Sequence, residues 1–205
     1  MKDQRRLLYV DLCIIKIEEK RVNMKNKIRN TLTGFAAMFI SACSNQTMSV
    51  IKPVSYVDLN QFMGDWYVIA CIPTMIETEA YNAVESYHLK EDGSIDTTFV
   101  YRESGFDGVE KRYNPRGYVI ENTGNAVWDM QFIWPFKSEY IIAYLNKDYS
   151  STIIARNARD YVWIMARTPL IDDNRYNELT KTVANLGYDV RKLRKTPHNS
   201  HIQLK

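Results

Sequence analysis

The feature that most constrains the fold is a series of eight short segments in which apolar and polar residues alternate. This alternation is typical of strands with one face in a core and the other toward water. Polar turns such as Glu91–Ser94 separate the segments, so consecutive strands can pair as antiparallel neighbours. The segments are Trp66–Cys71, Ala83–Lys90, Ile95–Arg102, Arg112–Ile120, Ala126–Trp134, Glu139–Asn146, Ser151–Arg156 and Asp160–Arg167. We therefore expect an all-β fold, an eight-stranded antiparallel up-and-down barrel wide enough for one small ligand.

After the eighth segment the apolar spacing changes to that of a helix. The apolar stripe consists of Tyr176, Leu179, Val183 and Leu186. Asp172 or Asp173 can cap the start of this helix, and Gly187 can end it in the left-handed conformation. We expect one C-terminal α-helix that packs on the outside of the barrel. A free amphipathic helix on a membrane surface is the alternative.

Residues 24–42 carry the parts of a secretory signal, namely a basic head, an apolar run and small residues before a cleavage point. The apolar run Leu32–Ile40 has about nine residues, too few to cross a hydrocarbon core that needs roughly 20. The sequence Ile40-Ser41-Ala42-Cys43 resembles the lipobox of bacterial lipoproteins, which implies lipidation of Cys43. A buried cysteine in a short core helix is the alternative.

The remaining boundaries follow from this signal. Residues 1–23 precede the basic head, which normally stands at the extreme N-terminus, so we interpret Met24 as the true start; a real N-terminal extension is the alternative. Residues 43–55 then form a tether, 56–190 the folded domain and 191–205 a basic polar tail. The tail could contact anionic lipid head groups or remain a solvated end.

Composition argues against several functions. The net charge of +3 is small and spread along the chain, which excludes a nucleic-acid-binding surface. Cys71 has no partner for a disulfide within the mature domain and is expected to be a small buried residue. The sequence shows no nucleophile with a matching His and Asp set, no phosphate-binding loop and no metal-ligand spacing. We therefore expect no catalytic residues, no metal, no cofactor and no enzymatic activity.

Three motifs carry a family resemblance. They are Met63–Ala70, which is similar to the G-x-W start of the first lipocalin strand, Leu145–Tyr149, and Asp160–Pro169 with its arginine. On these motifs the chain is identified as a member of the lipocalin family from about Tyr56 to Val190. It is most similar to the bacterial lipocalins that resemble apolipoprotein D, on the basis of Ile72-Pro73-Thr74 and Tyr161–Ile164.

The resemblance implies roles for particular residues. It implies a structural role, not a binding role, for the family-signature residues Gly64, Trp66 and Arg167. Trp66 is expected to close the narrow end of the barrel, and Arg167 is expected to lie over Trp66. Strand parity aligned with the family places a largely apolar set in the lumen as the lipid-binding surface: Ala83, Glu85, Tyr87, Leu89, Phe99, Tyr101, Tyr113, Trp128, Met130, Phe132, Trp134, Tyr140 and Ile142. Ordinary core packing is the alternative for each of them. Glu85 departs from the apolar pattern and either faces the lumen or turns to solvent at a bulge.

The implied function is that of a membrane-anchored lipocalin that binds and stores or carries a fatty acid, a lysophospholipid or a similar ligand. Ser44 stands where an Asp would retain a lipoprotein in the inner membrane, so we expect the outer membrane, facing the periplasm. A tethered interaction module with a structural lumen, a small lipid-modifying enzyme and a homodimer stay open. A membrane-spanning barrel is disfavoured by charged residues at outward positions.

Overall fold

The computed structural model describes residues 49–73 and 79–199. The predicted leader, the signal, Cys43 and the tether up to residue 48 therefore lie outside the described residues, as do Thr74 and the last residues of the tail. Within the described ranges the chain is mainly β-sheet, with a short helix before the first strand and a longer one after the ninth.

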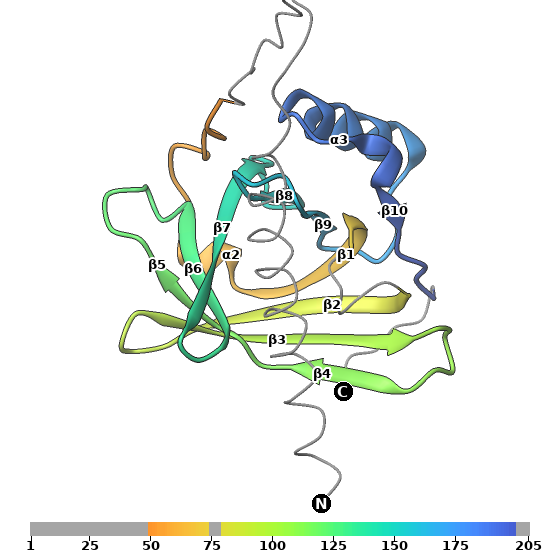
Figure 1. Ribbon diagram of the computed structural model, residues 1–205, viewed down its shortest axis with the longest axis horizontal. Helices are drawn as coiled ribbons and strands as arrows, with labels where there is room; N and C mark the ends of the chain where they lie inside the picture. The colour runs from red at the N-terminus through yellow and green to blue at the C-terminus, as the bar shows by residue number, and fades with distance from the viewer. Residues whose placement is uncertain (1–48, 74–78, 200–205) are drawn as a thin grey trace, which may run out of the picture. The chain divides into compact units, whose positions relative to one another are not determined.

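The strands form a barrel in an up-and-down order (Figure 1). From β1 to β3 and from β5 to β9 each strand pairs antiparallel with the next, and β3 pairs with β5. Strand β1 pairs with β9 from Tyr67↔Ala166 to Ile72↔Val162, which closes the sheet on itself. The described strands are β1 (Gly64–Ile72), β2 (Ala80–Leu89), β3 (Ser94–Glu103), β4 (Glu110–Tyr113), β5 (Arg116–Val119), β6 (Val127–Ile133), β7 (Phe136–Leu145), β8 (Ser151–Ala155), β9 (Val162–Ala166) and β10 (Arg194–Lys195).

One predicted strand is split into two. Both β4 and β5 pair with β3, and Asn114 and Pro115 separate them. Proline has no backbone N–H to donate, so the ladder is interrupted at this point. Together β4 and β5 fill the fourth place around the barrel, and the predicted eight-stranded antiparallel barrel is confirmed.

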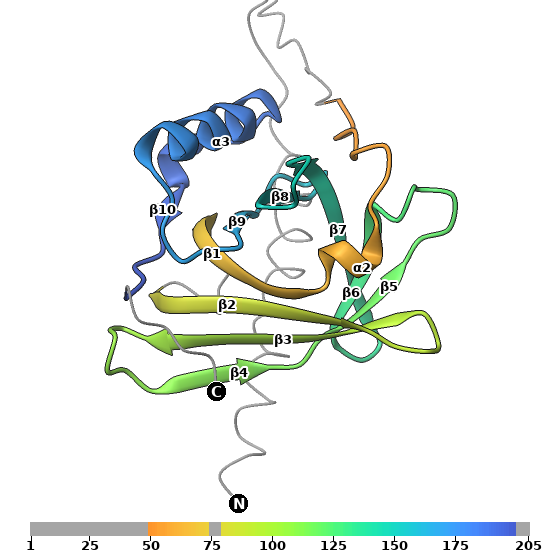
Figure 2. The same cartoon turned by 180° about the vertical axis from the view of Figure 1, so that it is seen from behind.

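The predicted helix is also confirmed. Helix α3 (Asp173–Asn185) is capped by the Asp172 side chain, which accepts a hydrogen bond from Arg175 N at 2.9 Å. It ends before Gly187, whose φ is +90°. Leu179 and Val183 are buried against the outer face of the barrel in a cluster that includes Ile69, Ile141, Ile153 and Ile164. The helix thus lies on the outside of the sheet (Figures 1 and 2).

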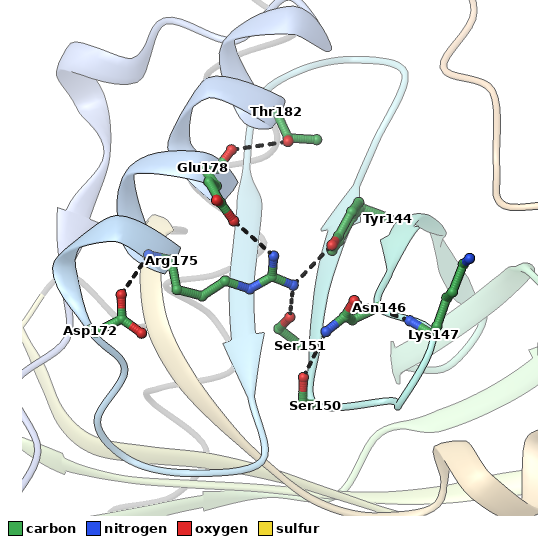
Figure 3. Close-up of polar contacts among 9 residues, drawn as sticks. All are labelled: Tyr144, Asn146, Lys147, Ser150, Ser151, Asp172, Arg175, Glu178 and Thr182. Carbon is green, nitrogen blue, oxygen red and sulfur yellow. Dashed lines mark hydrogen bonds and ion pairs between the residues drawn. The ribbon is translucent and has the colours of Figure 1, made fainter.

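Arg175 ties the first turn of α3 to the barrel wall (Figure 3). Its guanidinium donates to the Tyr144 hydroxyl on β7 at 2.8 Å and to Ser151 on β8. It also pairs with Glu178 at 3.1 Å within the helix. Because Arg donates in a fixed fork, these contacts set the rotation of the helix as well as its position.

The C-terminal segment fills a gap between β1 and β2. Strands β1 and β2 pair only from Gly64↔Tyr87 to Tyr67↔Val84. Beyond this point β10 pairs with β1, and Thr196 N donates to Ile69 O at 2.9 Å. On the other side Asn82 N donates to Pro197 O at 2.9 Å. The sequence places these residues in a polar tail, but the structure joins residues 194–197 to the barrel through backbone hydrogen bonds.

His198 gives this segment a pH dependence. Its Nε2 donates to Val68 O at 2.8 Å, and its ring packs edge-on against Tyr67. Burial lowers the pKa of the imidazole from its ordinary 6.5, and the hydrogen bond to Val68 opposes this shift only in part. The unfolded chain therefore takes up a proton first as the pH falls, so the folded state loses stability below about pH 6.5.

We predict that His198→Gln reduces this loss between pH 7 and pH 5. Glutamine keeps a donor for Val68 O and cannot titrate. Urea unfolding at several pH values measures the effect, with His88→Gln as control because His88 is exposed on β2. Equal pH dependence in the parent and in His198→Gln would contradict the assignment.

Candidate functional site: the barrel lumen

The N-terminal end of β1 is closed by aromatic packing. Helix α2 (Leu59–Phe62) precedes β1, and Asp58 caps it by accepting from Asn60 N. The Trp66 indole donates to Phe62 O at 2.8 Å, and the two rings lie 5.0 Å apart. Phe62 also meets the Trp128 ring edge-on at 5.4 Å. Trp66 and Trp128 are both fully buried, so this end of the lumen is filled by side chains.

Arg167 covers the closed end from outside. Its guanidinium carbon lies 3.9 Å from the centre of the Trp66 ring. It donates to three backbone carbonyls: Asp65 O at 2.8 Å, Gln61 O at 2.7 Å and Phe62 O at 3.0 Å. Burial lowers the pKa of Arg167, and the nearby Asp65 charge opposes that effect. The arginine therefore joins α2 to β1 while it stacks on the tryptophan, which is the arrangement that the resemblance implies.

Most of the predicted lumen residues lie in the barrel interior. Those buried there are Ala83, Tyr87, Phe99, Tyr101, Trp128, Met130, Tyr140 and Ile142. Leu89 and Tyr113 are half-buried against the same cluster. Interior residues that the parity argument missed include Phe62, Val68, Cys71, Ile95, Ile154 and Met165. Cys71 is buried, as expected.

Phe132 and Trp134 correct the prediction. Their side chains are 43% and 82% exposed. The pairing of β6 with β7 shifts register between Met130 and Ile133, so Phe132 lies at the edge of the interior and the inward alternation does not reach Trp134. Trp134 lies in the turn between the two strands, where no neighbouring strand covers it. Neither residue belongs to the buried interior.

A pair of tyrosine hydroxyls lies deep in the interior. The hydroxyls of Tyr87 and Tyr140 are 2.6 Å apart, and the Tyr140 ring stacks on Trp128 at 5.0 Å. Burial, followed by the charge of Glu85, raises the pKa of both tyrosines well above 10. Both hydroxyls therefore stay protonated, and because one of them donates to the other, the pair has one O–H left for a further acceptor.

Glu85 faces the interior. It is only 7% exposed and shares the strand parity of Ala83 and Tyr87. It lines a small hollow together with Met130, Phe132, Ser138, Glu139, Tyr140, Tyr161 and Trp163. This hollow has a volume of about 10 Å³, roughly what one water needs. A hollow of this size does not hold an acyl chain.

Residues 49–73 and 79–199 hold no group of three or more His, Cys, Asp or Glu side chains placed to bind a metal ion. In the same ranges none of the helices combines the length and the apolar character needed to cross a bilayer.

With this geometry in view, comparison with known proteins defines the class. Residues 57–198 match the lipocalin-like domain family, and the chain belongs to that family. It is 29% identical over 168 residues to the outer membrane lipoprotein Blc of Escherichia coli, which covers 77% of this chain and 89% of that protein. Apolipoprotein D of Bos taurus is 25% identical over 143 residues, 66% of this chain and 74% of that protein.

Solved structures share the fold. Insecticyanin from the tobacco hornworm Manduca sexta superimposes with a TM-score of 0.57 at 16% identity, over 71% of this chain and 83% of that one. Lobster apocrustacyanin A1 superimposes with a TM-score of 0.55 at 15% identity, over 74% of this chain and 92% of that one. At these identities the likeness shows the barrel fold and nothing about the ligand.

Proposed function

We propose that the barrel binds a hydrophobic ligand with one acyl chain, of the fatty acid or lysophospholipid class, and stores or carries it at a membrane. The observation that carries this proposal is a closed barrel whose inward side chains are apolar and aromatic, in a chain of the lipocalin-like family. Such a lining suits a hydrocarbon tail, with few polar groups to fix its orientation.

The burial energy is sufficient for useful affinity. Burying about 16 methylenes at about 0.8 kcal/mol each gives a gross gain of about 12 kcal/mol. Ordering of the chain and loss of free motion remove several kcal/mol of this gain. A dissociation constant near micromolar or tighter corresponds to the remaining 8 kcal/mol or so.

The location is proposed on separate grounds. Cys43 follows a signal-like segment and Ser44 is not an aspartate. The E. coli relative is an outer membrane lipoprotein by name. We therefore place this protein on the outer membrane, anchored through acyl chains on Cys43 and facing the periplasm. The barrel supplies binding rather than catalysis in this account.

Displacement of an environment-sensitive fatty-acid probe tests the proposal. We predict that Tyr113→Asp weakens probe binding at least tenfold, because Tyr113 packs against Phe99 and Tyr101 on the inner face and a carboxylate there must be desolvated. Arg112→Asp is the matched control, since Arg112 is the exposed neighbour on the outer face. Circular dichroism verifies that both variants fold. Equal probe affinity in the two variants would refute binding in the lumen.

Glu85 is expected to influence ligand preference. A buried carboxylate beside the Tyr87 and Tyr140 hydroxyls disfavours a ligand that brings a second negative charge or a terminal methyl to that depth. We predict that Glu85→Ala changes the relative affinities for ligands of different chain length by about threefold or more, whereas Glu91→Ala in the exposed β2–β3 turn does not. Superimposable binding curves for every ligand would discard this role.

A further inference from the structure

The turn between β6 and β7 exposes an apolar cluster, and all of it except Phe132 lies outside the proposed binding site. This hairpin tip consists of Phe132, Ile133, Trp134 and Phe136, and their exposed fractions are 43%, 56%, 82% and 69%. No charged residue interrupts the stretch from Gln131 to Phe136. Exposed apolar residues that stand singly are ordinary, but a contiguous group of this kind marks an interaction surface.

The tip lies at the same end of the barrel as the start of the described chain. Strands β6 and β8 run in the same direction, because each is antiparallel to β7. The loops that follow β6 and β8 therefore share one end, and the Ser138 and Tyr161 hydroxyls bond to each other there. Ile51 N donates to Asn157 Oδ1 at 2.7 Å in the loop after β8.

The chain enters the barrel at this end. Ser49 O accepts a hydrogen bond from Arg159, which lies in the same loop as Asn157. The segment from Cys43 to Ser49 reaches at most about 20 Å even when fully extended. Acyl chains on Cys43 would therefore hold this end of the barrel close to a bilayer. This step rests on the anchoring in the proposed function, but the exposure of the tip does not.

We propose that the hairpin tip inserts into the interfacial region of a lipid bilayer and turns the end of the barrel opposite Trp66 toward the membrane. The tip carries a tryptophan, whose ring prefers the boundary between head groups and acyl chains, and three further apolar side chains that gain by leaving water. Phe132 also lines the hollow beside Glu85 and Met130. Insertion therefore brings the wall of the lumen next to the lipid from which a ligand would come.

Vesicle binding tests this surface. The full chain with Cys43→Ser, which cannot be acylated, is mixed with phosphatidylethanolamine and phosphatidylglycerol vesicles, and the bound fraction is measured by sedimentation. We expect Trp134→Ser combined with Phe136→Ser to lower the partition coefficient at least tenfold. The control is Tyr56→Ser combined with Leu170→Ser. These two residues are similarly exposed and lie toward the opposite end, and we expect their replacement to change the partition coefficient less than twofold.

Fluorescence identifies the residue that enters the lipid. Vesicles with brominated acyl chains should quench part of the tryptophan emission in the Cys43→Ser chain, and Trp134→Phe should abolish that quenching while vesicle binding persists. Equal partition of the tip and control variants would overturn the proposal. A second outcome would also overturn it. If the tip variant partitions to vesicles like the parent, but size exclusion shows that a dimer of the parent is lost in the variant, then the tip is a contact between two copies of the chain. Displacement of the fatty-acid probe is measured without vesicles and does not depend on the hairpin tip. Failure of the proposed lumen binding can therefore be told apart from failure of the proposed membrane insertion.

Discussion

Replacing Trp66 by Ala is expected to lower the free energy of unfolding by about 3–5 kcal/mol, the range for large buried aromatics. The indole is fully buried, its ring centre lies 5.0 Å from that of Phe62, and its N–H donates to Phe62 O. Truncation removes this packing, leaves a cavity and removes one of the two donors to the Phe62 carbonyl, the other being Arg167. Denaturant unfolding followed by circular dichroism measures the change.

Trp134→Ala is the matched control for this prediction. It removes the same side chain from a position that is 82% exposed, so the free energy of unfolding should change by no more than about 0.5 kcal/mol. If both variants lose the same stability, the closed end does not depend on the packing of Trp66. Probe binding should persist in Trp66→Ala at temperatures where the variant stays folded.

Replacing Arg167 by Ala is expected to cost about 2–4 kcal/mol. The guanidinium lies 3.9 Å from the Trp66 ring centre and donates to carbonyls of Gln61, Phe62 and Asp65. A cation over an indole contributes about 0.5–2 kcal/mol, and charged hydrogen bonds contribute about 1.5–3 kcal/mol each when water does not replace them. Because Arg167 is only half-buried, water will replace some of these bonds.

Arg167→Lys separates charge from geometry. Lysine keeps the positive charge near Trp66 but cannot donate as a fork to three carbonyls, so we expect roughly half of the loss. Arg112→Ala removes an exposed arginine that pairs with Glu110 and should change stability by no more than about 0.5 kcal/mol. If Arg167→Lys is as stable as the parent, the charge alone matters. If Arg167→Ala is as stable as the parent, Arg167 does not stabilise the closed end.

Much of the barrel could be predicted because the alternation of strands is a local signal. Each predicted strand has a counterpart, and the split of the fourth at Pro115 is visible in the sequence once the missing donor is considered. Helix α3 was predictable from its stripe and from its Asp172 cap. The contact of Arg167 with Trp66 joins residues about 100 positions apart, and only the family resemblance pointed to it.

The remaining differences have local causes. Trp134 was placed inside because a period of two was extended across a register shift that composition does not reveal, and for the same reason Phe132, at the edge of the interior, is more exposed than predicted. Phe62 was missed because it stands on a one-turn helix, which is too short to show a period. Strand β10 was missed because its two residues are charged and exposed, and only their backbone joins the sheet.

Native mass spectrometry of the full chain with Cys43→Ser, which cannot be acylated, tests the central claim most directly when the protein is produced in bacteria and purified without detergent. The account predicts a species heavier than the bare chain by the mass of one lipid, reduced in Tyr113→Asp and retained in Arg112→Asp. If all three proteins appear only at the bare mass, and remain so after incubation with a fatty acid, the lumen does not hold an acyl chain and the proposed function is wrong.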